Sequence, residues 1–161
     1  MRLKFLDWFK KKEVKEEAPK PQVVPMKALD YPPKILVAWA KAIEGNKDFL
    51  DWLKENGYPE LNTACAAIRL NEPARQWLMN NGYPHLLAFI QAAESNKKAK
   101  AWLENNQFNL LLKMALAIDG DKDALEWVRE TQTIDIYLLM MAIKVVKDEI
   151  EDYNNDPHVF K

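Results

Sequence analysis

The sequence is poor in the residues that nucleophilic and metal chemistry require. It contains one cysteine and two histidines, His85 and His158, and its single serine is Ser95. Cys65 lies among alanines, so we expect a packed, reduced thiol, and no disulfide can form within the chain. Two histidines and one cysteine do not supply a typical zinc site, and no glycine-rich phosphate loop is present. We therefore expect a protein that is not an enzyme and that holds no metal or cofactor.

The sequence also lacks an excess of charge of one sign and any long apolar run. Lysine and arginine together number 23 and aspartate and glutamate 24, which leaves no positive field to attract nucleic acid. Charges interrupt the apolar residues of the opening Met1–Asp7, which is unlike a secretory signal. No stretch of eighteen uncharged apolar residues predicts a membrane span. These features predict a cytoplasmic protein that does not bind nucleic acid.

One spacing resembles a calcium-binding loop. Asp119, Asp121, Asp123 and Glu130 stand at positions 1, 3, 5 and 12 of such a loop. Ala124, however, occupies the position where the loop requires glycine. We favour the alternative in which Asp121 caps a helix.

The most prominent feature that is present is an internal repeat of 25 residues. Four tryptophans share this spacing: Trp52, Trp77, Trp102 and Trp127. An alanine column stands ten residues before them and continues once more: Ala42, Ala67, Ala92, Ala117 and Ala142. A third column is aliphatic throughout: Leu36, Leu61, Leu86, Leu111 and Ile136. The chain therefore contains about four and a half copies of one unit.

Each unit is predicted to form two short helices. Leu36, Trp39 and Ile43 share one helical face, and Phe49, Trp52 and Leu53 share a face of the next helix. A polar column before each second helix provides N-caps: Asn46, Asn71, Asn96 and Asp121. Asn-Gly-Tyr-Pro sequences at residues 56–59 and 81–84 predict glycine C-caps, with a proline that ends the helix. The predicted fold is all-α, an α-solenoid whose stability comes from stacking of its units.

The tryptophan column has two interpretations. A large apolar residue at a constant position in every unit is typical of side chains that fill the space between stacked layers, which is the interpretation we favour. The alternative is an aromatic ladder that binds a ligand at the surface.

Residues 40–57, AKAIEGNKDFLDWLKENG, resemble the two-helix part of an ankyrin repeat. The order is an alanine-rich helix, a Gly-Asn turn, a second helix with paired large apolar residues, and Asn-Gly. The unit is shorter than the ankyrin repeat of about 33 residues and lacks its Thr-Pro-Leu-His element and its hairpin. HEAT-like stacks are an alternative relationship. The resemblance, which spans roughly residues 35–143, implies protein recognition through side chains on the first helices.

The chain divides into three predicted regions: an N-terminal segment and linker at 1–33, a helical repeat domain at 34–150 and an acidic tail at 151–161. The linker is rich in proline, lysine and glutamate, a composition that buries too little surface to order itself. Ahead of it, one helical face would gather five apolar residues: Leu3, Phe5, Leu6, Trp8 and Phe9. This face either anchors the chain to a membrane surface or a partner, or frays or folds back on the repeats.

A binding surface is expected where the first helices vary between units. Two such columns become apolar toward the C-terminus, and they nominate four partner-binding residues: Lys113, Leu116, Leu138 and Met141. The alternative is that these helices are simply buried or self-associate. We expect a protein–protein interaction module with a protein or peptide partner. The alternative function is a structural subunit on a membrane surface or in a complex, tethered by its N-terminal segment.

Overall fold

A computed structural model describes residues 29–158 of the 161-residue chain. This part of the chain is all-helical and confirms the predicted fold class. Its helices are α2 Pro33–Ile43, α3 Lys47–Glu55, α4 Pro59–Ile68, α5 Glu72–Asn80, α6 Pro84–Ala93, α7 Lys97–Asn105, α8 Asn109–Ile118, α9 Lys122–Thr131 and α10 Ile134–Asn155. We call α2, α4, α6, α8 and α10 the first helices of their units, and α3, α5, α7 and α9 the second helices.

The caps that begin the second helices are those that the sequence predicts. At all four N-cap positions the side-chain oxygen accepts a hydrogen bond from a backbone N–H of the first turn: Asn46, Asn71, Asn96 and Asp121. Asp121 Oδ1 accepts from Ala124 N at 2.9 Å, which confirms its role as a helix cap. These bonds satisfy amides that have no partner within the helix, so each second helix begins at the same place in its unit.

The buried core follows the predicted alanine column and two further columns with the same 25-residue period. The alanine column is buried in every unit and allows close approach of helix backbones: Ala42, Ala67, Ala92, Ala117 and Ala142. The residue after each repeated tryptophan is fully buried: Leu53, Leu78, Leu103 and Val128. A further column three residues before the alanines fills the centre: Trp39, Ala64, Phe89, Met114 and Leu139. The core therefore lies between the first helices and beneath the second helices.

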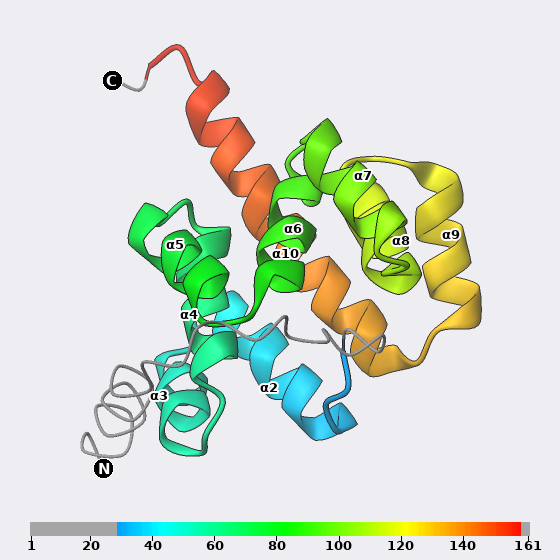
Figure 1. Ribbon diagram of the computed structural model, residues 1–161. Coiled ribbons are helices and arrows are strands. Elements are labelled where there is room, and N and C mark those ends of the chain that lie inside the picture. The colour runs from blue at the N-terminus through cyan, green and yellow to red at the C-terminus, as the bar shows by residue number, and fades with distance from the viewer. Residues whose placement is uncertain (1–28, 159–161) are drawn as a thin grey trace.

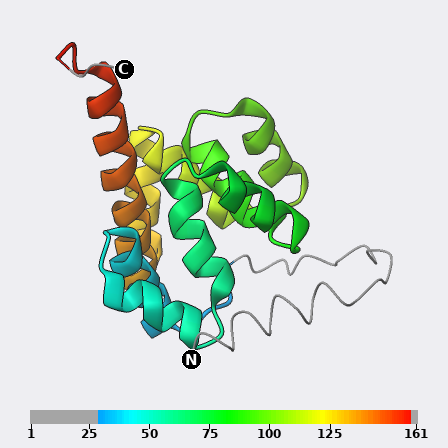
Figure 2. The same cartoon turned by 90° about the vertical axis from the view of Figure 1, so that its left-hand side faces the viewer.

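The first helices do not form an open row. Each packs on the next, from α2 to α4, α6, α8 and α10, and α10 in turn packs extensively on α2 and also contacts α4. In Figure 1, α10 passes behind α6 from the side of α9 toward α5, and α2 lies alongside its first half. Figure 2 shows α10 upright at one side of the molecule with its C-terminal end beyond the other helices. The 25-residue period does not predict this closure.

The turns after α2, α4, α6 and α8 each contain one residue in the left-handed region, always at the same repeat position. Glycine occupies this position in two units, at Gly45 with φ 99° and Gly120 with φ 107°. Leu70 and Ser95 occupy it in the other two, with φ of 67° and 69°. A side chain with a Cβ is disfavoured there, so the second and third units carry local backbone strain.

Helix α10 is longer than the other described helices and reaches Asn155, beyond residue 150, the predicted end of the repeat domain. The first residues of the predicted acidic tail are therefore helical. Among the helices at residues 29–158, none combines the length and apolar character that crossing a membrane requires.

Candidate partner-binding surface

Three of the repeated tryptophans stack, nearly parallel and offset, on a second aromatic ring six residues later. Trp52 stacks on Tyr58, Trp77 on Tyr83 and Trp102 on Phe108. The ring centroids lie 6.3, 5.9 and 5.6 Å apart, with interplanar angles of 15°, 10° and 9°. In each pair the indole belongs to a second helix, and its partner is the N-cap residue of the following first helix. The pairs therefore lie at the N-terminal ends of α4, α6 and α8.

The favoured interpretation of these tryptophans as interior filler is wrong for Trp52 and Trp127, whereas Trp77 and Trp102 pack, partly buried, against the core. Trp52 is 40% exposed and Trp127 37%, and the other two indoles are half-buried. The space between layers is filled by the leucine or valine that follows each tryptophan and by the Trp39 column. Helical periodicity places a tryptophan on the inner side of its helix, but it does not show how much of the ring the neighbouring turns cover.

Side chains between the stacked pairs join them into one row. Tyr31 meets Tyr58 edge to face at 6.0 Å, and its hydroxyl donates a 2.9 Å hydrogen bond to Glu60 Oε1. His85 lies 6.3 Å from Tyr83 and stacks on Phe108 at 5.6 Å. We call this row the aromatic edge. Its members are Tyr31, Trp52, Tyr58, Glu60, Trp77, Tyr83, His85, Trp102 and Phe108.

Burial shifts the pKa values of three titratable side chains in the aromatic edge, Tyr31, Tyr83 and His85. Desolvation, with the nearby Glu60 carboxylate as a further cause, raises the pKa of Tyr31 far above its ordinary value and that of Tyr83 to about 12. Desolvation also lowers the pKa of His85 to about 4. At neutral pH the two hydroxyls are therefore protonated and the imidazole is neutral. The edge offers aromatic faces and hydrogen-bond donors, which suits recognition of a polypeptide.

Two members of the aromatic edge, Glu60 and His85, belong to the same column of the repeat. Glu60 and His85 are equivalent positions 25 residues apart, and Leu110 and Asp135 continue the column. Glu60, His85 and Asp135 are the buried polar side chains in the part of the chain that the structure describes. Neither this column nor the aromatic N-caps were predicted from the sequence. The available signal was the tyrosine of each Asn-Gly-Tyr-Pro turn, which stands six residues after a tryptophan.

The fourth unit departs from this arrangement. Thr133 occupies the position of the aromatic N-cap, so Trp127 has no ring to stack on there. Lys113 Nζ instead lies 5.9 Å from the centroid of the Trp127 ring, a cation–π contact. Trp127 is therefore a natural internal control for the other three indoles.

The predicted partner-binding residues lie on two helices that pack together, α8 and α10. Lys113 is exposed and Leu138 is 43% exposed, whereas Leu116 and Met141 are half-buried against the core. Their role in partner binding stays a prediction. The predicted N-terminal anchor, Leu3, Phe5, Leu6, Trp8 and Phe9, lies outside the described residues.

An apolar cavity of about 230 Å³ opens at the other end of the first helices. Ile68 and Leu70 from α4 and its following turn, Ile90 from α6, and Ile143 and Ile150 from α10 contribute its apolar lining. The strained Leu70 is 52% exposed at this cavity. The cavity therefore lies between the C-terminal ends of α4 and α6 and the C-terminal half of α10.

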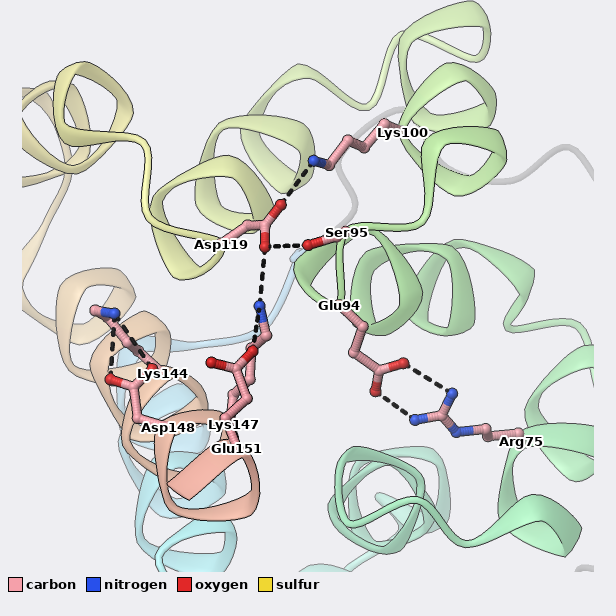
Figure 3. A network of polar contacts seen from close by, with 9 residues as sticks. All are labelled: Arg75, Glu94, Ser95, Lys100, Asp119, Lys144, Lys147, Asp148 and Glu151. Carbon is pink, nitrogen blue, oxygen red and sulfur yellow. Dashed lines mark hydrogen bonds and ion pairs between the residues drawn. The ribbon is translucent and has the colours of Figure 1, made fainter. Parts of the chain in front are cut away.

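Polar clusters elsewhere act as clamps between units, as Figure 3 shows. Asp119 accepts hydrogen bonds from Ser95 Oγ at 2.5 Å, Lys100 Nζ at 2.8 Å and Lys147 Nζ at 3.0 Å. Burial alone would raise the pKa of Asp119, but these donors outweigh it and hold the pKa at about 2. Arg75 pairs with Glu94 through two hydrogen bonds. The two clamps are equivalent, since Lys100 and Asp119 each stand 25 residues after Arg75 and Glu94.

Cys65 and Ser95, the candidate nucleophiles, each donate a hydrogen bond within the fold. Cys65 is buried, its Sγ donates to Leu61 O at 3.3 Å, and desolvation raises its pKa to about 12. A thiol with so high a pKa is a weak nucleophile at neutral pH. Ser95 is held by a carboxylate rather than by a histidine base. In the described part of the chain, no group of three or more His, Cys, Asp or Glu side chains is arranged to hold a metal ion.

No family model, curated protein or solved structure matches this chain. The resemblance to the two-helix part of the ankyrin repeat therefore stays a prediction.

Proposed function

We propose that this protein is a non-enzymatic interaction module that binds a protein or peptide partner along its aromatic edge. The observation that supports the proposal is the row of three stacked pairs on consecutive units, with indole faces left partly open to solvent. Tryptophan and tyrosine are the side chains that contribute most at protein interfaces. Their stacking also fixes the rings in place, so little side-chain entropy is lost on binding.

The proposed partner site, the aromatic edge, differs from the site on α8 and α10 that the variable columns predicted. Lys113, Leu116, Leu138 and Met141 remain a second candidate surface because two of the four side chains are exposed on adjacent helices. The aromatic edge is favoured because it spans three units and combines aromatic faces with hydroxyl donors.

The test is affinity capture from native cell extract with the intact chain and three variants. Trp77→Ala and Trp102→Ala each remove one indole of the aromatic edge. Trp127→Ala removes the equivalent indole that lacks a stacked ring, and serves as the matched control. We expect one or more proteins to be retained by the wild type and by Trp127→Ala, and to be lost from both edge variants.

Thermal unfolding of each variant shows whether it remains folded at the capture temperature. Capture that is equal for all folded variants would contradict the proposal. Loss confined to a Leu138→Ser variant would transfer the binding site to the α8 and α10 surface instead.

A further inference from the structure

Helix α10 carries an exposed apolar face over its first three turns. Ile134 is 69% exposed, Leu138 43% and Val145 48%, and Met141 between them is half-buried. Successive members are four, three and four residues apart, so they lie on one side of the helix. We call these four residues the α10 face. The helix that carries it stands at one side of the molecule (Figure 2).

The repeat itself does not explain the apolar character of the α10 face. In α8 the equivalent positions are also exposed, but they hold Asn109 and Lys113 where α10 has Ile134 and Leu138. The other first helices are each followed by a second helix, whereas none follows α10 among the described residues. The outer face of a terminal unit is normally polar because no further unit covers it. An apolar face at this place is typical of an interface with another molecule.

The spacing of the α10 face matches the seam of a two-helix coiled coil. Apolar residues alternately four and three apart occupy the a and d positions of the heptad, which pack against a second helix. The α10 face is also complementary to itself. If two copies of α10 run antiparallel about a twofold axis between residues 139 and 140, Ile134 of one copy meets Val145 of the other and Leu138 meets Met141. Each apolar residue then has an apolar partner in the second copy.

The charges beyond the α10 face favour the antiparallel orientation. The same side of the helix continues with two exposed carboxylates, Asp148 and Asp152. In an antiparallel pair these carboxylates extend past the N-terminal end of the second copy of α10, where the helix dipole is positive. Arg129, in the last turn of α9, is exposed five residues before α10 begins. In a parallel pair the carboxylates of the two copies would instead lie side by side and repel each other.

We propose that the α10 face is a homodimer interface, through which two copies of this chain pair antiparallel. Leu138 and Met141 are among the predicted partner-binding residues, and their partner is then a second copy of the chain. Four side chains on one helix cover less than the roughly 800 Å² per partner of a standard interface, so the dimer is expected to dissociate reversibly at micromolar concentration. The aromatic edge contains no residue of α10, so this inference does not depend on the proposed function.

Sedimentation velocity of the purified intact chain tests the self-association. We expect the weight-average mass to rise from monomer to dimer between about 1 and 300 µM. A chain that stays monomeric throughout this range would overturn the proposal. Association that continues beyond the dimer would also overturn it, because a twofold pairing is closed.

Charged variants identify the surface that associates. Ile134→Glu with Val145→Glu places like charges in contact and is expected to weaken the association at least about tenfold. Phe49→Glu with Met79→Glu adds the same charge at two other exposed apolar positions, on α3 and α5, and is the matched control. It is expected to leave the association unchanged, and an equal effect of the two variants would overturn the proposal.

A variant of mixed charge tests the orientation. Ile134→Lys with Val145→Glu places opposite charges in contact when the helices are antiparallel, and like charges in contact when they are parallel. We expect this variant to associate at least about tenfold more tightly than Ile134→Glu with Val145→Glu. Equally weak association of the two variants would overturn the antiparallel pairing.

Circular dichroism shows whether each variant keeps the helical content of the wild type. Both substituted positions of α10 are exposed, so we expect the variants to remain folded at the temperature of sedimentation. If Ile134→Glu with Val145→Glu unfolds, the single variant Ile134→Glu, at the more exposed position, replaces it with Met79→Glu as its control. Undiminished self-association of folded Ile134→Glu would then overturn the proposal.

Discussion

His85 makes folding stability depend on pH. The folded state holds its imidazole neutral, with a pKa of about 4, whereas an unfolded chain titrates near 6.5. Between these values the unfolded state binds more protons, so stability is fully present above about pH 6.5 and is lost as the pH falls toward 4. The slope approaches at most about 1.4 kcal/mol per pH unit.

Leucine is the residue that the repeat itself uses at this position in the next unit, at Leu110. A His85→Leu variant is expected to abolish the loss of stability between pH 6.5 and 4, as measured by urea unfolding across that range. The Asp119 contribution is separate, because its pKa of about 2 places the corresponding loss mainly below pH 4. An unchanged slope in His85→Leu would assign the dependence to other groups.

The polar N-caps and the alanine column were predictable from the sequence because each performs a local task that fixes the type of side chain. The caps accept amide hydrogen bonds, and the alanines occupy little space between helices. The exposure of the indoles was not predictable in this way. Trp52 belongs to α3 and Tyr58 is the N-cap of α4, and a helical face pattern does not show how much of a ring the neighbouring elements cover.

Leu70 occupies a left-handed position that glycine occupies in two other units. Leu70→Gly is expected to raise the free energy of unfolding by about 1 kcal/mol, because strain is relieved and a half-exposed side chain gives up little burial. The reciprocal Gly120→Ala, at the same repeat position with φ 107°, is expected to lower the free energy of unfolding by a similar amount. Chemical denaturation measures both, and a destabilised Leu70→Gly would show that the leucine contributes more at the cavity than its backbone costs.

At the scale of elements, the 25-residue period was sufficient to predict that the units consist of α-helices, and to predict their order and spacing. The turns and caps then fixed where each second helix begins. Contacts between units were less accessible to sequence reasoning. The Arg75–Glu94 and Lys100–Asp119 clamps join residues 19 apart in the chain, from a second helix to the end of the following first helix. Ion pairs at surface positions are common and mostly weak, so the pairing could not be chosen without the geometry.

Asp119 accepts from two lysines and a serine, so its loss leaves more donors unsatisfied than the loss of any other clamp carboxylate. Asp119→Asn is expected to destabilise the protein by about 2 kcal/mol, and Glu94→Gln by about 1 kcal/mol. Glu126→Gln provides the control, since its pair with Arg129 is more than half exposed and contributes less than about 0.5 kcal/mol. Equal effects for Asp119→Asn and Glu126→Gln in thermal or chemical unfolding would show that the cluster does not clamp the units.

At the scale of the whole molecule, the sequence did not predict the packing of α10 on α2. Curvature of a helical stack results from small rotations between neighbouring units, and these depend on side-chain volumes rather than on the period. In an open stack each unit contacts only its neighbours. Here the last helix contacts the first, so the two ends of the repeat region share one core.

This shared core predicts coupling between distant units. Met140 is fully buried in α10, and Met140→Ala is expected to cost about 2–4 kcal/mol. Hydrogen exchange of the amides in α2 is expected to accelerate by the same free energy, although α2 lies about a hundred residues earlier. Tyr153→Ala on the exposed end of α10 is the control and is expected to leave α2 unchanged. Protection of α2 that survives Met140→Ala would show that the ends unfold independently.

Because α10 returns to α2, the number of units is part of the architecture rather than a free variable. Open repeat arrays accept an inserted copy by growing longer, since each interface is reproduced one step further along. A duplicate of residues 83–107 inserted after residue 107 would here push α10 away from α2, and the enlarged chain is expected to melt at a lower temperature than the original. Evolution of this fold by gain or loss of single repeats would therefore be blocked, and change would come instead through substitutions within a fixed set of units.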